Sequence, residues 1–175
     1  MGRILSSRLT FTLFSVFAFI VCAARAQATD ISGTISTTLT IFNDSELVGD
    51  VKCTVAGGPC IQFGAPGITL RLNGFTITGP DVPPAGCTPA TSLDDGIDDV
   101  IGLHDLAILG PGRVQEFGGF GIGLFGSTKA KVEGITASDN CFSGIILAGA
   151  SDSDIQKNVS VRNSQGSEDA PCGGT

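Results

Sequence analysis

The 175-residue sequence contains no tryptophan and no tyrosine, and His104 is its single histidine. Tryptophan and tyrosine combine a flat apolar face with a polar edge, which suits wet, amphipathic ligands such as sugars. Their absence argues against a dedicated carbohydrate-binding module that stacks sugars on aromatic rings. The single histidine and the absence of any Cys-x-x-Cys pair argue against a zinc site.

The sequence also lacks helical periodicity and basic clusters. Between residues 31 and 119 the apolar residues do not recur at helical spacing, and glycine or proline interrupts the chain at short intervals. All 17 acidic residues follow residue 28, whereas three of the 10 basic residues precede it, so residues 29–175 carry a net charge near −10 (7 − 17). Nucleic acid and anionic lipid are therefore not expected as partners. An acidic polysaccharide would be repelled too, unless Ca²⁺ or a local arginine bridged it.

Residues 1–28 have the pattern of a secretory signal peptide. Arg3 and Arg8 precede an uncharged apolar run over residues 9–24, and two small-x-small cleavage sites follow. The run is short of the roughly 20 residues that span a bilayer. We therefore expect a mature domain of residues 29–175 that has no membrane span and is secreted, periplasmic or displayed on the cell surface.

The last third of the chain repeats itself. Residues 120–140 and 143–163 align without a gap at an offset of 23. A period of this size indicates a supersecondary unit that buries its apolar face only by stacking on a copy of itself. The matched pairs are Gly121 and Gly144, Ile122 and Ile145, Leu124 and Leu147, Val132 and Ile155, and Asn140 and Asn163.

Asn140 and Asn163 suggest an asparagine ladder, in which stacked amides hydrogen-bond along the stack. A compatible alternative is that each asparagine only favours a tight turn. Earlier in the chain, residues 75–80 match residues 106–111 at an offset of 31, which predicts that Gly79 and Gly110 turn the chain at the same level of two successive coils.

Residues 80–96 are rich in proline, glycine and other turn formers, and they predict an insertion loop between coils. Residues 164–175 begin another coil without finishing it. We therefore expect that the natural chain continues past Thr175 or that this sequence is a fragment.

Two segments resemble a known family. The stretch GITLRLNGFTITG at 67–79 and the stretch GIILAGASDSDIQKNVSVRN at 144–163 are similar to bacterial, exported right-handed β-helix repeat proteins of the pectin-lyase-like superfamily. The resemblance covers about residues 58–163. It implies an all-β, right-handed parallel β-helix (a solenoid) of about five to six coils. This group includes periplasmic copper-site assembly factors and carbohydrate-active enzymes, so the resemblance does not choose a function.

The best catalytic candidates are Asp94, Asp95, Asp98 and Asp99. Four carboxylates so close in the sequence repel one another, and bound calcium or protonation of one member would relieve that repulsion. Paired carboxylates also suit glycosidic cleavage, and His104 and Arg113 follow closely. The alternative interpretation is a solvated acidic loop beside the insertion. The resemblance does not extend to the enzymes' motifs, because Asn-Thr-Asp is missing and His104 has no flanking glycines.

Five cysteines follow the signal peptide. Cys141 and Cys172 precede equivalent points of successive coils, and a rung spacing of about 4.8 Å lies within the Cα separation of a disulfide. We therefore expect a Cys141–Cys172 bridge. Cys53 and Cys60 flank a short turn and predict a local bridge, which leaves Cys87 free.

These observations favour an exported, non-catalytic monomer that presents a binding face to a polysaccharide or a cell-surface glycan. One alternative is a polysaccharide lyase or glycoside hydrolase at the acidic cluster, for which calcium is the candidate cofactor. The other is a structural or adhesive surface repeat.

Overall fold

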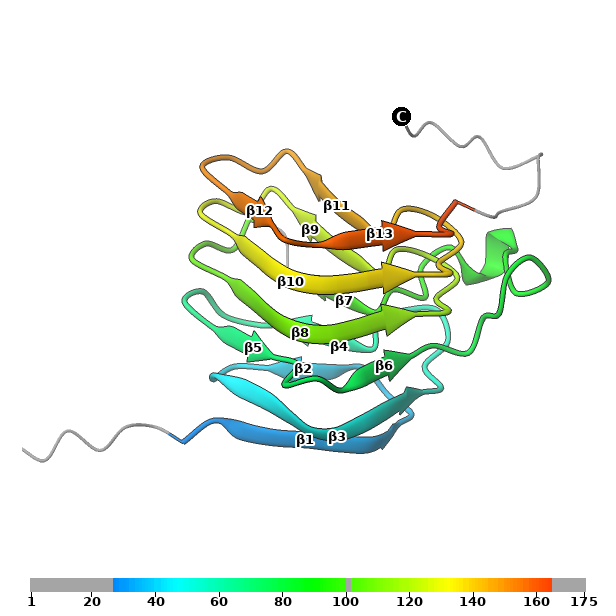
Figure 1. Cartoon of the computed structure of the whole chain (residues 1–175), viewed down its shortest axis with the longest axis horizontal. Coiled ribbons are helices and arrows are strands. Elements are labelled where there is room, and N and C mark those ends of the chain that lie inside the picture. The colour runs from blue at the N-terminus through cyan, green and yellow to red at the C-terminus, as the bar shows by residue number, and fades with distance from the viewer. Residues whose placement is uncertain (1–26, 100–101, 165–175) are drawn as a thin grey trace, which may run out of the picture.

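The computed structural model describes residues 27–99 and 102–164, and this part of the chain is almost entirely β-structure (Figure 1). The predicted cleavage region up to residue 26 and the tail 165–175 lie outside the described residues. The larger sheet contains β1 (Thr29–Ile35), β3 (Ser45–Cys53), β5 (Thr69–Arg71), β6 (Thr76–Thr78), β8 (Ala107–Gln115), β10 (Lys131–Ser138), β12 (Asp154–Gln156) and β13 (Val159–Val161). The smaller sheet contains β2 (Leu39–Ile41), β4 (Ile61–Phe63), β7 (Ile97–Asp99), β9 (Ile122–Phe125) and β11 (Ile145–Ala148).

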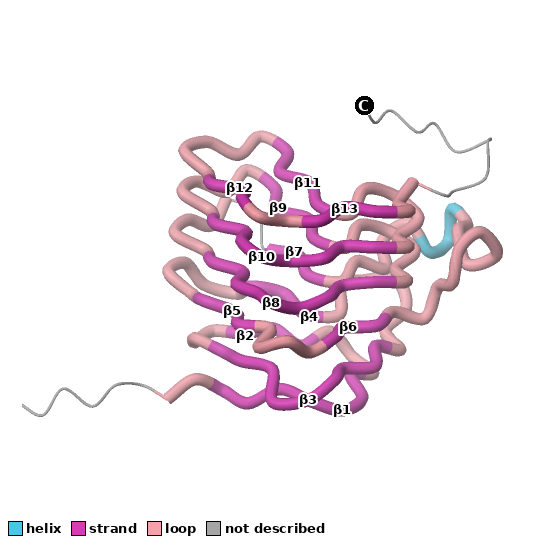
Figure 2. The backbone as a smooth tube through the Cα atoms, in the orientation of Figure 1, coloured by secondary structure: helices cyan, strands magenta, loops and turns pink. Residues whose placement is uncertain are grey.

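All paired strands run parallel, and the chain visits the two sheets in turn (Figure 2). The larger sheet has the order β1-β3-β5-β8-β10-β12, with β6 and β13 joining the same levels, and the smaller sheet has the order β11-β9-β7-β4-β2. Each level is therefore one coil of a stack, an arrangement compatible with a β-solenoid. The only described helix is a short 3₁₀ turn, η1 (Pro89–Thr91).

The core lies between the two sheets and follows from strand periodicity. Alternate residues point inward, and β-branched and other aliphatic side chains from successive coils therefore stack in columns. In the larger sheet Leu70, Ile108 and Val132 form one such column, and in the smaller sheet Ile61, Ile97 and Ile122 form another. All six side chains are completely buried.

The repeat in the last third of the chain is confirmed by strand register. Ile122 pairs with Ile145 between β9 and β11, and Val132 pairs with Ile155 between β10 and β12. The two aligned segments are therefore two successive coils.

The predicted match between residues 75–80 and 106–111 is wrong. Ile77 of β6 pairs with Val114 of β8, and the match had required it to lie beside residue 108. Gly79 follows β6 and donates its N–H to the carbonyl of Gln115 at 2.8 Å, whereas Gly110 lies inside β8. The two segments look alike because each contains a Gly-Pro pair. The first pair, which begins at Gly79, follows the end of β6, whereas the second, which begins at Gly110, lies in the middle of β8.

The first and last described coils differ in size and closure. Thr29 pairs with Ser45, so the first coil is shorter than the later ones, and its core side chain Ile31 is only 5 % exposed. The last coil keeps the full repeat, and Ile155 above Val132 is 49 % exposed. Among the described coils, the stack is therefore tapered at the first and open at the last.

Candidate functional site

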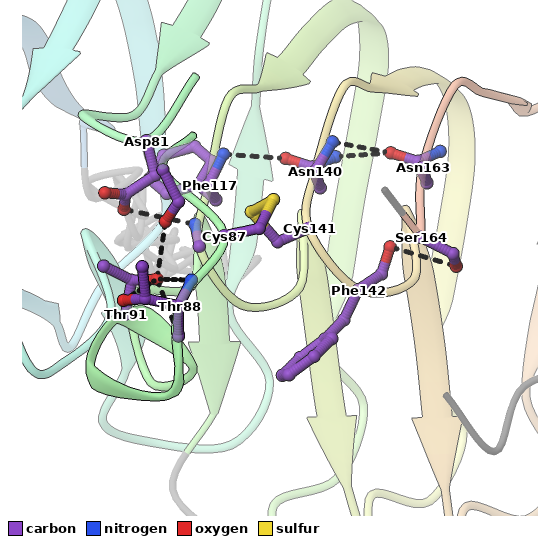
Figure 3. The surroundings of a disulfide bond; sticks show 12 residues. Asp81, Cys87, Thr88, Thr91, Phe117, Asn140, Cys141, Phe142, Asn163 and Ser164 are labelled. Carbon is purple, nitrogen blue, oxygen red and sulfur yellow. Dashed lines mark hydrogen bonds between the residues drawn. A yellow bond between two sulfur atoms is a disulfide. The ribbon is translucent and has the colours of Figure 1, made fainter. Parts of the chain in front are cut away.

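The predicted insertion, residues 80–96, folds back onto the stack at one corner (Figures 1 and 3). Its Cys87 forms a disulfide with Cys141, which directly follows the turn after β10, and their Cα atoms are 5.3 Å apart. The prediction of a Cys141–Cys172 bridge with Cys87 free is therefore wrong. Cys172 itself lies outside the described residues.

This error has a physical cause. The spacing argument assumed that a cysteine pairs with the equivalent position of the next coil, but the insertion brings a residue 54 positions away to the same corner. The predicted bridge between Cys53 and Cys60 is present, with Cα atoms 5.9 Å apart. Two disulfides fit an oxidising, extracellular type of environment.

The acidic residues of the corner are buried, which overturns the interpretation as a solvated loop. Asp94, Asp95 and Asp99 are 3–6 % exposed. Asp81, which the sequence reasoning did not single out, is buried beside them. Its only sequence signal was its position at the first residue after a Gly-Pro turn.

Each buried carboxylate accepts a hydrogen bond from the backbone of another coil or loop. Asp94 accepts from the N–H of Gly57, and Asp95 accepts from the N–H of Phe120 at 2.6 Å. Asp81 accepts from the N–H of Gly118 at 3.2 Å. An unpaired buried N–H is costly. These carboxylates therefore stabilise the irregular backbone of the corner by accepting its hydrogen bonds.

Asp99 has the same role on the next turn. It ends β7 and accepts hydrogen bonds from the N–H of Phe125 at 2.8 Å and from the hydroxyl of Ser127. Asp98, its neighbour, is half-buried and accepts from the N–H of Asp99 at 2.7 Å. The four predicted candidates therefore serve four separate backbone donors.

Burial shifts the acid–base behaviour of these groups. Desolvation is the largest cause in each case, and it raises the pKa of Asp95 to about 7 and the pKa of Asp98 to about 6. Desolvation also raises the pKa of Asp81 to about 6, helped by the nearby charge of Asp94. The pKa of Asp99 is raised in the same direction. A carboxyl with a pKa near neutrality is what a general acid needs, but burial and the neighbouring carboxylates account for these shifts without a catalytic role.

The structure does not form the predicted calcium site. No group of three or more histidine, cysteine or acidic side chains in residues 27–99 and 102–164 is arranged to hold a metal ion. Backbone N–H groups donate hydrogen bonds to these carboxylates and offset part of the repulsion that suggested calcium.

His104 and Arg113 do not join the acidic cluster. His104 is exposed, and its Nδ1 lies 2.8 Å from Oδ2 of Asp105. Arg113 lies in β8 of the larger sheet and donates from Nη1 to the hydroxyl of Ser138 at 3.0 Å, whereas Asp98 and Asp99 lie in β7 of the smaller sheet. The six candidate catalytic residues are therefore not assembled into one constellation.

The asparagine ladder is confirmed at the same corner (Figure 3). Nδ2 of Asn140 donates to Oδ1 of Asn163 at 2.9 Å, and Oδ1 of Asn140 accepts from the N–H of Phe117 at 3.2 Å. Nδ2 of Asn163 donates to the carbonyl of Ala137 at 3.0 Å. The ladder stops at Phe117 because the coil below has phenylalanine, completely packed in the core, at the asparagine position.

The outer face of the larger sheet carries a groove that the sequence reasoning missed. Its volume is about 360 Å³, and it crosses β5, β8, β10 and the loop that follows β12, so it runs along the stack. We call it the axial groove, and its lining residues are Arg71, Leu109, Gly110, Pro111, Glu133, Gly134 and Lys157. It lies where the register between β10 and β8 shifts, after Glu133. Gly110 and Gly134 have no side chains to fill the space at this point, which leaves a hollow across neighbouring levels.

The axial groove is locally basic in an acidic protein. Glu133 lies between Nζ of Lys131 at 2.7 Å and Nζ of Lys157 at 2.6 Å. Hydrogen bonds from both lysines lower the pKa of Glu133 to about 2. Arg71 is exposed and forms no ion pair with any described residue. Two lysines therefore neutralise Glu133, and Arg71 is an additional cation of the groove that is free to bind a ligand.

Register explains why the sequence did not reveal this groove. Arg71, Leu109 and Glu133 occupy one outward column of the larger sheet. They come from three different coils. Because the insertion lies between Arg71 and Leu109, their spacings along the sequence are unequal, and the column can be recognised only once the fold of the insertion is known.

No helix within the described ranges has the length and apolar character to cross a membrane. No protein family model matches this sequence, and comparisons with curated proteins and with solved structures give no match either.

Proposed function

We propose that this protein is a non-catalytic binding protein that holds a linear polysaccharide, free or on a cell surface, along the axial groove. The observation that carries the proposal is the groove itself, which runs across successive coils and presents the unpaired guanidinium of Arg71.

The groove matches a chain-like ligand in direction and chemistry. Parallel rungs repeat at about 4.8 Å, so a groove that crosses four levels offers contacts at regular steps along the stack. The floor formed by Leu109 and Pro111 supplies apolar contact that tryptophan and tyrosine would otherwise supply. Arg71 can hydrogen-bond hydroxyl or carboxylate oxygens through its planar fork of donors. A local arginine is also what an acidic polysaccharide would need on a chain of this net charge.

The hydrogen bonding of the buried carboxylates favours a binding function over a cleavage reaction. A glycosidase needs two carboxyl groups that face the same bond from a shared cleft. The buried carboxylates of this corner instead accept hydrogen bonds from backbone donors. A polysaccharide lyase or glycoside hydrolase at Asp94, Asp95, Asp98 and Asp99 is therefore the weaker alternative.

The proposal includes a finer description of the fold and location. We take the stack to be a right-handed parallel β-helix of the pectin-lyase-like type, exported after removal of residues 1–28. Parallel crossovers are right-handed in about 98 % of known cases, which supports the hand. The two disulfides support export.

Retention on insoluble polysaccharides tests the binding proposal. The purified chain is incubated with a panel of neutral and acidic plant and bacterial polysaccharides, and bound protein is measured as a function of its concentration. Arg71→Ala should weaken retention about tenfold, because a charged hydrogen bond contributes about 1.5 kcal/mol or more. Lys52→Ala removes an exposed cation from the same sheet outside the groove, and it should leave retention unchanged. Equal retention of both variants would refute the groove as the binding site.

The same incubations test the enzymatic alternative. New reducing ends or unsaturated ends in the supernatant would show hydrolysis or elimination. Release of such ends, abolished by Asp98→Ala but kept by Asp152→Ala, would overturn the non-catalytic proposal. Retention without new ends is the expected result.

A further inference from the structure

We propose that the outer face of the smaller sheet carries a binding site for a quaternary ammonium ligand, formed by a cluster of phenylalanine rings and one carboxylate. We call this site the phenylalanine shelf, and its residues are Asp98, Phe120, Phe125 and Phe142. The axial groove lies on the other sheet, so the shelf does not depend on the proposed polysaccharide binding.

The three rings of the shelf form one cluster outside the core. The ring centroids of Phe120 and Phe125 are 6.0 Å apart, with the ring planes inclined at 58°. Those of Phe120 and Phe142 are 5.6 Å apart and inclined at 49°. All three side chains are half-buried, and none belongs to the core between the sheets. The cluster therefore keeps aromatic surface open to solvent, and the negative face of an aromatic ring attracts cations.

Gly123 explains why a ring lies against this face of the sheet. It occupies an outward position of β9, between the buried core residues Ile122 and Leu124. A Cβ atom at Gly123 would lie 2.8 Å from Cε2 of Phe125 and 3.6 Å from Cδ2 of Phe120. The ring of Phe125 therefore fills the space that a side chain at position 123 would take.

Asp98 lies beside that ring. Its neighbours Ile97 and Asp99 are buried, so the side chain of Asp98 points outward from β7. Asp98 pairs with Gly123 between β7 and β9, which sets its carboxyl and the ring of Phe125 on adjacent rungs, about 4.8 Å apart, in one outward column. Asp98 forms no ion pair with any described residue. The shelf thus joins aromatic rings to a carboxylate that has no cation beside it.

The charge of the smaller sheet favours a cationic ligand. Its five strands contain no lysine and no arginine, and the only other acid in them, Asp99, is buried. A cation that approaches the shelf therefore meets no like charge on these strands. The net charge near −10 of residues 29–175 also attracts cations at long range.

The polar groups of the shelf favour a quaternary ammonium over a primary one. A primary ammonium has three N–H donors, and each needs an acceptor once water is displaced. The outward column supplies the carboxylate of Asp98 and, on the neighbouring rung, the side-chain amide of Gln62. A quaternary ammonium donates no hydrogen bond, so ring faces and one nearby carboxylate are sufficient to hold it.

A titration with choline, a small quaternary ammonium, tests the shelf on the unmodified protein. Backbone amide chemical shifts are followed at about pH 8, where Asp98 is ionised because its pKa, raised by desolvation, is about 6. We expect saturable shifts centred on residues 120–125. Two control ligands are the neutral isostere of choline, in which carbon replaces the nitrogen, and ethanolamine, the primary amine. Both should bind at least about tenfold more weakly than choline. Absence of choline binding at these residues, or equal binding of either control ligand, would overturn the proposal.

Two pairs of variants test the carboxylate and the rings separately. Asp98→Asn preserves the shape of the side chain and should weaken choline binding about tenfold or more. Asp152→Asn removes the same charge from an exposed turn and should leave the affinity unchanged. Phe125→Leu should weaken binding about fivefold, because it keeps apolar bulk but removes the ring. Phe42→Leu is its control, since Phe42 is an exposed ring that also lies over a glycine, Gly64, but outside the cluster.

The comparison of ligands on the parent protein needs no substitution, so the proposal stays testable if a variant fails to fold. Circular dichroism and the urea midpoint establish that each variant is folded before its affinity is measured. Parent-like affinity in folded Asp98→Asn or Phe125→Leu, or an equal loss in either control variant, would refute the shelf as the binding site.

Discussion

The regular coils formed by β8 to β11 and the inserted corner at residues 80–96 stabilise the same stack in different ways. In the regular coils, contacts repeat: Ile122 lies on Ile145 and Asn140 on Asn163, at the same offset along the chain. In the corner, no contact repeats. Cys87 bonds a residue 54 positions away, and Asp95 caps a backbone N–H on the next coil.

The difference shows what periodicity can and cannot supply. A repeating coil satisfies its backbone through the parallel ladder and its side chains through columns, so each coil needs only its neighbours. An insertion breaks the ladder, and its backbone donors must find other partners. Here those partners are buried carboxylates, held in place by a disulfide.

The disulfides should give the largest difference between corner and coils. Replacing Cys87 and Cys141 together with serine should lower the free energy of unfolding by about 4 kcal/mol, because the bridge closes a loop of 54 residues. The Cys53–Cys60 pair closes a separation of only 7 residues, and its removal should cost about 2 kcal/mol. Urea denaturation without reductant measures both values. A larger loss for the Cys53–Cys60 pair would contradict this account of the corner.

The corner should also make the protein less stable as pH rises. Burial raises the pKa of Asp95 from 3.8 to about 7, so the folded state binds more protons than the unfolded state between these values. The contribution is complete below about pH 4 and is lost as pH rises through 7, and it amounts to about 2–4 kcal/mol. Asp81 and Asp98 act in the same direction.

Urea denaturation at pH 4, 6 and 8 checks this dependence. Asp95→Asn keeps an acceptor for the N–H of Phe120 but does not titrate, so it should reduce the slope while Asp81 and Asp98 keep the remainder. Asp152→Asn changes an exposed residue and should leave the slope intact. A parent protein whose stability increased from pH 4 to pH 8 would show that the corner carboxylates do not dominate.

Within the regular coils, the ladder should show a smaller effect. Asn140→Ala leaves the buried N–H of Phe117 without its side-chain acceptor and removes the donor to Asn163, which should cost about 2–3 kcal/mol. Asn163 is half-buried at the open end, and Asn163→Ala should cost about half as much. Thermal unfolding of the two variants separates them, and equal losses would argue against a ladder in which burial sets the energy.

The exposed ion pairs of the coils should have the smallest effect. Glu133→Gln removes the pairs with Lys131 and Lys157, and exposed pairs of this type contribute little. We expect no measurable change in the thermal midpoint at neutral pH. Because the pKa of Glu133 is lowered to about 2, any contribution is present above pH 4.5 and lost as pH falls through 2, opposite in sign to the corner. A clear loss at neutral pH would mean that the groove charges support the fold.

Sequence reasoning succeeded where contacts are periodic. The repeat offset predicted the register of β9 with β11 and the Asn140–Asn163 ladder, because equivalent positions of a stack must meet. It also found the Cys53–Cys60 bridge, which spans a short turn. It failed for Gly79 and Gly110, where a local similarity was mistaken for a level of the stack.

The candidate site was harder to predict for the same reason. The cluster of aspartates was visible as a cluster, but its burial depends on how the insertion folds onto neighbouring coils. The axial groove joins Arg71, Glu133 and Lys157 from three levels. No short window of sequence contains these residues together.

Stacked parallel coils follow from the amino-acid sequence alone, because its apolar positions alternate along strands and recur once per coil. Three-dimensional packing was needed to establish which cysteine Cys141 bonds, which backbone groups the buried aspartates serve, and where a free arginine faces a groove. The physical reason is that stacking in a repeat is a nearest-neighbour interaction that periodicity encodes. The fold of an insertion depends instead on which distant polar groups remain to be satisfied.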